Sequence, residues 1–315
     1  MKRVIIDTDP GIDDAAAIFL ALASPELKVE AITTIFGNGT LQECTRNALI
    51  ILETAGRSDI PVYAGAGKPL LRELTVAHNI HGEDALGGVG LPDPKSKPQT
   101  EHAVYEMIDR VMASPGEITL IALGRLTNVA LALSIEPRMA GALKELILMG
   151  GAVLAPGNAS EVATANLHGD PEAAAIVYQS GAPIVQVGMD VCRHVVFRQA
   201  HLARLRQARN PATGLLMRIT PQLAGAYAER LKHIPGAVTQ YNDVPAVAYA
   251  LDPSLFDARD LHVRIATHDE LTKGQTVTDV DNRWQRPPNA RVLMAVDANR
   301  LIEMFLARLA GCTAS

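Results

Sequence analysis

Short runs of β-branched and other apolar residues alternate along this chain with longer segments of helical period. Unbroken apolar strands separated by helices favour a largely parallel sheet that helices cover on both faces. We therefore predict an α/β fold with an open, mostly parallel central sheet flanked by helices. The strands are expected at residues 4–6, 29–35, 118–123, 145–149 and 184–187, and the helices at 14–23, 41–55, 103–112, 127–134 and 172–179.

The remaining segments add a long loop, a helical insertion and a short tail to this core. Residues 65–99 are rich in Gly, Pro and His, and loops of this length usually belong to a functional site or are mobile. Residues 199–231 are expected to form a mostly helical insertion near the C-terminal third, broken by Pro211 and Pro221. Strands are predicted at 261–265, 275–280 and 291–295, and a last helix at 298–310. Because no repeat or linker divides the sequence, residues 1–315 are expected to form a single domain.

Composition narrows the class of protein. The net charge is −5, only 4% of residues are aromatic, and no basic run is interleaved with aromatics, so nucleic-acid binding is not expected. Cys44, Cys192 and Cys312 lie far apart without a CxxC pair, which argues against a disulfide framework or a zinc site. The N-terminus lacks a signal-peptide pattern, and the longest apolar stretch, residues 15–23, is too short to span a membrane. A cytoplasmic protein with no membrane partner is therefore expected.

Four aspartates, Asp7, Asp9, Asp13 and Asp14, fall within eight residues after the first strand. The carboxyl ends of strands are where open α/β sheets bind ligands. Asp at a helix start caps free N–H groups, which accounts for one or two of the four. Four carboxylates without a nearby Lys or Arg in sequence repel one another unless a cation lies among them. The pattern favours a divalent metal site, and all-oxygen ligands favour calcium or magnesium over zinc.

The DTDPGIDDA segment closely resembles the N-terminal signature of the inosine-uridine type nucleoside hydrolases. Further matches follow in the same order over nearly the whole chain: Ile32-Thr33-Thr34, Gly37-Asn38, Ile80-His81-Gly82, Leu126-Thr127-Asn128, Leu148-Met149-Gly150-Gly151, Gly157-Asn158, Asn166, Asp170-Pro171-Glu172-Ala173, and Asp243 ahead of Ala246-Val247-Ala248.

The resemblance implies hydrolysis of the N-glycosidic bond of ribonucleosides to ribose and free base. One Ca²⁺ ion would be held by Asp9, Asp14, the backbone carbonyl of Thr127, and Asp243. Asp9 would be the general base that takes a proton from the calcium-bound water. The remaining substrate-binding residues would be Asp13, Asn38 and Asn166 on the ribose hydroxyls, together with His81 near the pocket mouth, Met149 and Asn158. By the same resemblance, a homo-oligomer (dimer or tetramer) and a role in nucleoside salvage are expected.

Two positions depart from the family pattern. Asn242 stands where many members carry a histidine that protonates the departing base, and an amide cannot deliver a proton at neutral pH. Tyr227, Tyr241 or Arg230 could assist the base instead, and the sequence does not choose among them.

Thr164 stands where a glutamate commonly grips the 5′ hydroxyl, so a 5′-modified ribonucleoside or nucleotide is an alternative substrate. Arg125 could pair with such an anion, although a surface position is favoured for it. Thr164 and Asn242 are both kept among the expected substrate-binding residues.

Two other functions compete with this one. Asp7-x-Asp9 after a strand is also the opening pattern of haloacid-dehalogenase-type phosphatases, although the PGIDD continuation and the distant Asn242-Asp243 pair fit that family poorly. The missing histidine would suit a non-catalytic, calcium-dependent ribose-binding protein. The presence of every expected metal ligand favours the enzyme.

Overall fold

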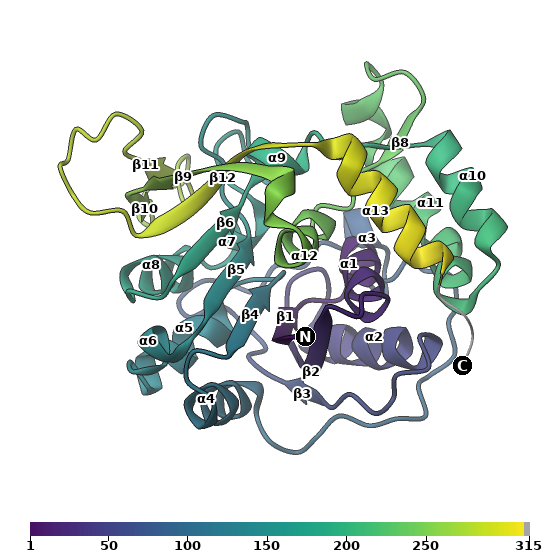
Figure 1. The fold of residues 1–315 in the computed structure, drawn as a ribbon, viewed down its shortest axis with the longest axis horizontal. Helices are drawn as coiled ribbons and strands as arrows, with labels where there is room; N and C mark the ends of the chain where they lie inside the picture. Colours follow the sequence, from purple (N-terminus) through teal and green to yellow (C-terminus); the bar gives the residue numbers. More distant parts are fainter. Residues whose placement is uncertain (312–315) are drawn as a thin grey trace.

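The computed structural model describes residues 1–311, and its centre is an eight-stranded sheet in the order β3-β2-β1-β4-β5-β6-β12-β9 (Figure 1). All neighbouring strands are parallel except the edge pair β12 and β9. The strands of this sheet are β1 (Lys2–Thr8), β2 (Leu27–Thr34), β3 (Val62–Ala64), β4 (Ile118–Ala122), β5 (Glu145–Met149), β6 (Ile184–Val187), β9 (Phe256–Leu261) and β12 (Ala290–Val296). The predicted open, mostly parallel α/β sheet is confirmed.

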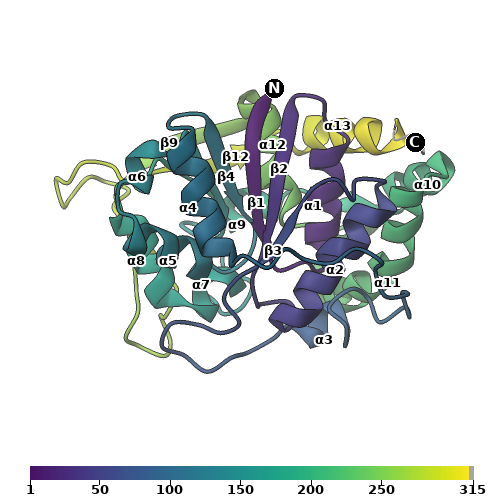
Figure 2. The ribbon, with the colours of Figure 1, turned by 90° about the horizontal axis from the view of Figure 1, so that it is seen from below.

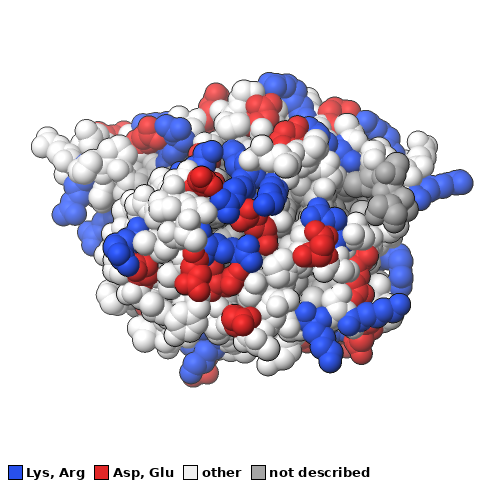
Figure 3. Space-filling model, turned by 60° about the horizontal axis from the view of Figure 1, so that its bottom comes forward, with Lys and Arg blue, Asp and Glu red and all other residues white. Residues whose placement is uncertain are grey.

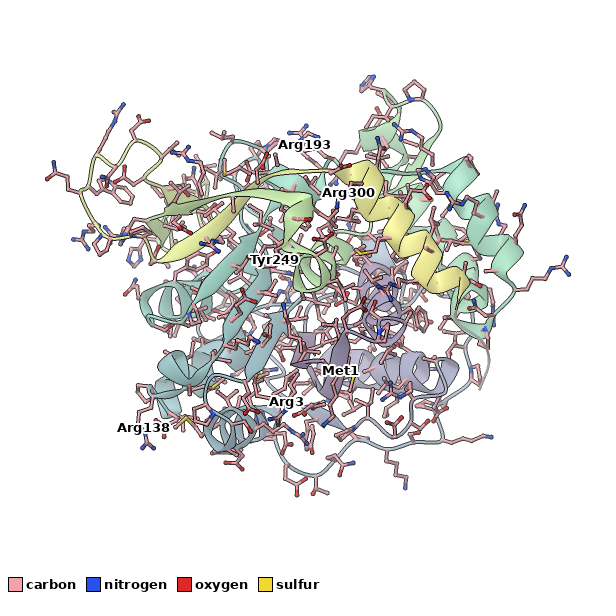
Figure 4. The ribbon with its side chains drawn as sticks, in the orientation of Figure 1. Met1, Arg3, Arg138, Arg193, Tyr249 and Arg300 are labelled. Atoms are coloured by element: carbon pink, nitrogen blue, oxygen red, sulfur yellow. The ribbon has the colours of Figure 1, made fainter. Side chains whose placement is uncertain are left out.

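Helices cover both faces of the sheet because successive strand residues point to opposite sides. In β1, Val4 and Ile6 pack into one apolar cluster and Ile5 into the other. The first cluster receives α1 (Ile12–Leu22), α2 (Leu41–Thr54), α10 (Gln199–Ala208), α11 (Pro211–Leu231), α12 (Val244–Leu251) and α13 (Ala298–Ala310). The second receives α4 (Ala103–Ala113), α5 (Thr127–Ile135), α6 (Met139–Ala142) and α8 (Pro171–Gln179). Side chains fill the space between the sheet and both layers (Figure 4).

The chain reverses its direction across the sheet next to β1. After β1 it builds β2 and β3 on one side, and then β4, β5 and β6 on the other (Figure 1). Such a switch point leaves a crevice at the carboxyl ends of the two central strands, and ligands bind there in open α/β sheets. The segments after β1, β2, β4 and β5, which carry most of the predicted site residues, all begin at this edge.

Short elements surround the core. They are α3 (His78–His81), α7 (Ala165–Gly169), α9 (Met189–Cys192), the 3-10 turn Pro253–Leu255, and two small antiparallel sheets made by β7 (Phe197–Arg198) with β8 (Ala237–Thr239) and by β10 (Val263–Ile265) with β11 (Thr276–Thr278).

Several predicted boundaries were wrong. Pro211 begins α11, as its missing N–H allows at a first turn, but Pro221 lies inside a continuous helix. Burial of Ile219 and Leu223 on either side of Pro221 in the same cluster keeps the helix intact. The strand predicted at 261–265 is divided between the end of β9 and β10, which belong to different sheets. β3 and most of β9 were missed because β3 has only three residues and β9 carries charged side chains on the sheet edge.

The surface carries both signs of charge. Lys and Arg side chains are interspersed with Asp and Glu over the face drawn in Figure 3. Among residues 1–311, no helix is long and apolar enough to cross a membrane.

Candidate active site

The turn after β1 places the aspartates at the switch point. Gly11 is the N-cap of α1, so the helix begins at Ile12, and Asp13 and Asp14 lie in its first turn. Asp14 accepts hydrogen bonds from Gly11 N through Oδ2 (2.9 Å) and from Thr8 Oγ1 through Oδ1 (2.5 Å). These bonds give partners to the Gly11 N–H and the Thr8 hydroxyl, and they hold the Asp14 side chain in one orientation, as in a capping box.

Asp13, Asp14 and Asp243 form a buried acidic cluster. One carboxylate oxygen of each lies within 4.8 Å of the others, and Asp243 is the N-cap of α12. Burial raises the pKa of Asp13 to about 6. Burial, and then repulsion from Asp13, raises the pKa of Asp243 well above its usual range and also raises that of Asp14. Asp13 Oδ1 is buried without a hydrogen-bond partner among the described residues. A divalent cation fits this donor set, because its charge would remove the repulsion among the carboxylates.

Asp9 is fixed beside this cluster by close backbone contacts. Its Oδ2 accepts a hydrogen bond from Asn38 N (2.9 Å). A Cβ atom at Gly37 would lie 1.9 Å from Asp9 Oδ2, and one at Gly124 would lie 2.6 Å from Oδ1. Burial, and then repulsion from Asp14, raises the pKa of Asp9 well above its usual range, whereas the charge of Arg125 lowers it. Asp9 is 3% exposed. The backbone at Gly37 and Gly124 packs directly against its carboxylate and leaves that group no room to move.

Asn38, predicted to contact the ribose, joins the two acidic groups in this structure. Its Nδ2 donates to the backbone oxygen of Asp9 (3.0 Å) and to Asp14 Oδ2 (2.8 Å).

The start of α5 brings Thr127 to the same edge. Thr127 Oγ1 donates to Asp170 Oδ2 (2.6 Å), and the next residue, Asn128, donates to Asp7 Oδ1 (2.9 Å). Asp7 is therefore buried behind the site, where desolvation raises its pKa to about 7. Asp170 and Asn128 appeared in the sequence only as parts of matching motifs and were given no role.

The residues predicted around the ribose and its 5′ group come together near α7. Asn166 Nδ2 donates to the backbone oxygens of Leu123 (2.5 Å) and Met149 (3.0 Å). Asn158 Oδ1 accepts from Ala165 N (2.8 Å). Thr164 is fully buried, and its hydroxyl accepts a hydrogen bond from Gly151 N (2.9 Å).

His81 was expected near the pocket mouth, but the structure places it against the first turn of α1. It is 5% exposed, Nδ1 accepts a hydrogen bond from Ile12 N (3.2 Å), and the same atom lies 3.8 Å from Asp13 Oδ1. Burial lowers the pKa of His81 to about 4, so the ring is neutral at pH 7.

The three candidates for helping the base to leave differ in their environment. Tyr241 is fully buried against Phe197 and Phe305, and its hydroxyl is bonded to Thr220 Oγ1 (2.6 Å). Tyr227 instead accepts a hydrogen bond from Asn242 Nδ2 (3.0 Å). Asn242 Oδ1 is buried without a partner among residues 1–311. The Arg230 guanidinium lies 4.5 Å from the Tyr227 ring centre.

Arg125 was expected on the surface, and this prediction was wrong. It is 6% exposed, its guanidinium lies 4.8 Å from the Phe36 ring centre, and its Nη1 donates to Thr75 O (2.7 Å). A Cβ atom at Gly169 would lie 2.0 Å from its Nε. Arg125 was overlooked as a charge near the aspartates because more than a hundred residues separate them in the chain.

Comparison with known proteins gives matches over nearly the full length. The family profile described as "Inosine-uridine preferring nucleoside hydrolase" matches residues 4–303. The chain is 40% identical over 312 residues to the pyrimidine-specific ribonucleoside hydrolase RihA of Shewanella sp. (strain ANA-3), covering 99% of this chain and 97% of that protein. It is 39% identical over 307 residues to RihA of Citrobacter koseri, with coverage of 98% and 97%.

Solved structures agree. A plant nucleoside hydrolase superposes with a TM-score of 0.94 at 38% identity, covering 98% of this chain and 99% of that one. A purine-preferring ribonucleoside hydrolase from Gardnerella vaginalis gives 0.93 at 31% identity, with 99% of both chains covered. The phosphatase and the non-catalytic binding protein find no support in these matches. The chain belongs to the inosine-uridine preferring nucleoside hydrolase family, and it is a ribonucleoside hydrolase.

Proposed function

We propose that this enzyme hydrolyses pyrimidine ribonucleosides to ribose and free base, with calcium as its metal and Asp9 as its general base. The observation that carries the proposal is the buried cluster of Asp13, Asp14 and Asp243 at the switch point of the sheet, with Asp9 joined to it through Asn38. Pyrimidine preference is supported by the curated relatives at 39–40% identity, whose names say pyrimidine-specific, whereas the purine-preferring structure is 31% identical.

The metal would be held by Asp9, Asp14, the Thr127 carbonyl and Asp243. When bound, calcium would supply positive charge that acidifies a water molecule and orients the ribose hydroxyls. Asp13 lies within reach of the same cluster and has one oxygen free, so it is placed to accept a hydrogen bond from a ribose hydroxyl.

Asp9 takes a proton from the attacking water. Its carboxylate is fixed by Asn38 N and by the backbone at Gly37 and Gly124, so it needs no rearrangement to act. As the bond to the base breaks, positive charge grows on the ribose, as in glycoside cleavage generally. The buried carboxylates of the cluster face that charge and stabilise it.

Ribose recognition falls to Asp13, Asn166 and Asn38. Asn166 is held by two backbone oxygens, and this fixes the direction in which its own Oδ1 points. Polar groups built for a hydroxyl discriminate strongly against a substrate that lacks it, because they are left buried and unpaired. We therefore expect ribonucleosides to be preferred over 2′-deoxyribonucleosides.

Tyr227 assists the departing base. Because its oxygen accepts the hydrogen bond from Asn242 Nδ2, its own O–H is free to donate to the base. The unpartnered Oδ1 of Asn242 adds an acceptor beside that donor. A donor and an acceptor side by side match the adjacent carbonyl and N–H groups of uracil.

A second candidate substrate is a 5′-modified ribonucleoside. The observation that favours it is Thr164, whose hydroxyl is bonded to Gly151 N, so no carboxylate stands at this position to grip a free 5′ hydroxyl. Arg125 does not strengthen this candidate, because its guanidinium is engaged by Thr75.

The test is release of reducing sugar from a riboside panel in the presence of calcium. The panel contains uridine, cytidine, inosine, adenosine, 2′-deoxyuridine, uridine monophosphate, a 5′-thioether nucleoside and p-nitrophenyl riboside. Fastest release from uridine or cytidine, abolished by chelation and in Asp9→Ala, supports the proposal. Release only from the phosphate or thioether moves the second candidate ahead, and fastest release from purines refutes the base preference. Sedimentation of the same protein tests the expected homo-oligomer.

A further inference from the structure

The segment between β3 and α3, residues 65–77, is fastened at three successive points although it has no regular structure. We call it the strap; it runs along the lower edge of the view in Figure 2. Ala66 N donates to Asn128 Oδ1 (2.8 Å), Leu70 N donates to Asp170 Oδ2 (2.9 Å), and Thr75 O accepts from Arg125 Nη1 (2.7 Å). Arg125 and Asn128 belong to the same short segment as Thr127, and Asp170 contacts Thr127, so all three points of attachment lie around Thr127.

Asp170 is the central point of attachment. Its Oδ2 accepts from both Leu70 N and Thr127 Oγ1, and its Oδ1 accepts from Ala173 N (3.1 Å) at the start of α8. The residue is fully buried, and both of its carboxylate oxygens accept hydrogen bonds. Charge-assisted bonds of this kind are stronger than those between neutral groups. Asp170 therefore joins the strap, Thr127 and α8 into one unit.

Arg125 supports the far end of the strap. It forms no ion pair with a carboxylate within 4.0 Å in residues 1–311. Its fixed contacts are Thr75, the face of Phe36 and the bare backbone of Gly169. Burying a guanidinium costs free energy unless its N–H groups are hydrogen-bonded. The bond to Thr75 O reduces this cost and also holds the end of the strap.

The strap continues directly into the substrate side of the site. Ala77 N donates to Gly37 O (3.1 Å), next to the backbone that packs on Asp9. His81 N donates to Ala77 O (3.0 Å), and His81 Nδ1 in turn receives Ile12 N at the acidic turn. Two hydrogen bonds through Asp170, the covalent chain of the strap and the bond from His81 N to Ala77 O thus connect Thr127 to His81.

We propose that Asp170 is a positioning residue that sets the Thr127 carbonyl for the metal, and that the strap couples this carbonyl to the placement of His81. The inference rests on the proposed function, in which that carbonyl is a metal ligand. It predicts that weakening the Asp170 contact lowers metal affinity, although Asp170 itself does not touch the metal.

Asp170→Asn is the sharpest change. The amide keeps the shape of the carboxylate but replaces one acceptor with an NH₂ group, which must then face a donor: Ala173 N in one orientation, or Leu70 N and Thr127 Oγ1 in the other. Loss of a residue that orients a metal ligand typically weakens metal affinity by about 10- to 100-fold. Thr127→Val removes the same Thr127–Asp170 bond without touching Leu70 and serves if Asp170→Asn does not fold.

The matched control is Asp190→Asn. Asp190 is also a buried carboxylate, and it accepts hydrogen bonds from Val153 N, Leu154 N and Ala155 N, away from Thr127. It should lower the melting temperature without changing calcium affinity.

The experiment is a calcium titration of the metal-free full-length chain by calorimetry, with hydrogen exchange of the strap amides measured alongside. We expect Asp170→Asn or Thr127→Val to weaken calcium binding about 10- to 100-fold. Asp170→Asn should also speed exchange at Leu70, and Asp190→Asn should bind calcium like the unchanged chain. Equal calcium affinity in Asp170→Asn and the unchanged chain overturns the inference and leaves the proposed function standing. Failure of the unchanged chain to bind calcium overturns both.

Discussion

Gly37→Ala should inactivate the enzyme by displacing a single carboxylate. The added Cβ would lie 1.9 Å from Asp9 Oδ2 and 2.7 Å from Asp9 Cγ, whereas ordinary contact begins at 3.4 Å. The shortfall to Oδ2 is about 1.5 Å (3.4 minus 1.9). Because the backbone of Gly37 does not adopt positive φ, alanine is allowed there and the Asp9 carboxylate must move instead. A misplacement of about 1 Å can cost roughly 10²-fold in rate, so we expect kcat/KM for uridine to fall at least that far.

The assay is uracil release at saturating calcium, with circular dichroism as a check that the variant folds. Gly214→Ala is the matched control, since an added Cβ there meets nothing within 4 Å and the residue lies inside α11. The control should retain full activity and gain stability by about 0.5–1 kcal/mol. A folded Gly37→Ala enzyme within threefold of the unchanged kcat/KM would refute the assignment of Asp9 as a fixed base.

Three further changes test other parts of the site and the fold. Tyr227→Phe should lower kcat for uridine by roughly 10²-fold, because the donor to the base is lost; p-nitrophenyl riboside, whose leaving group needs no such help, should be hydrolysed at an almost unchanged rate, and an equal loss on both would contradict the role. In the metal-free protein, Asp13 contributes stability below its ordinary pKa of 3.8 that is lost as the pH rises through about 6. The pKa values of Asp9, Asp14 and Asp243 are also raised, so these residues likewise lower the stability of the metal-free fold as the pH rises. His81 has the opposite effect, because its pKa is lowered to about 4. The rise in melting temperature on adding calcium should therefore be larger at pH 7 than at pH 5, and a smaller rise at pH 7 would contradict the repulsion. Phe305→Ala, in the aromatic group with Phe197 and Tyr241, should destabilise the fold by about 3–5 kcal/mol in urea unfolding, well above the effect of a surface change.

The parallel core could be predicted because its strands are buried on both faces and are therefore mostly apolar. β1, β4, β5 and β6 carry this pattern, with the charged residues of β1 near its ends and one buried glutamine, Gln186, in β6. β9 could not be found in the same way, since an edge strand tolerates charged residues such as those at 257, 259 and 260.

Local sequence motifs were enough to predict the acidic turn, but they could not predict contacts between segments that are far apart in the chain. Four aspartates in eight residues indicate a site by themselves, and the structure brings three of the predicted acidic residues together. Arg125 and Asp170 were different, because their roles depend on Thr75, Leu70 and Thr127, which fold against them from elsewhere in the chain. The choice of Tyr227 over Tyr241 likewise depended on which hydroxyl the surrounding side chains already occupy.

The most direct test is uracil release from uridine by protein stripped of divalent cations, before and after calcium is added back, with Asp9→Ala measured in parallel. The stripped protein should release no uracil and should recover on addition of calcium, forming ribose and uracil in equal amounts. Asp9→Ala should still bind uridine but stay inactive at every calcium concentration. Undiminished release by the stripped protein, or substantial turnover by Asp9→Ala, would contradict the assignment of the acidic cluster as a metal-dependent hydrolytic centre.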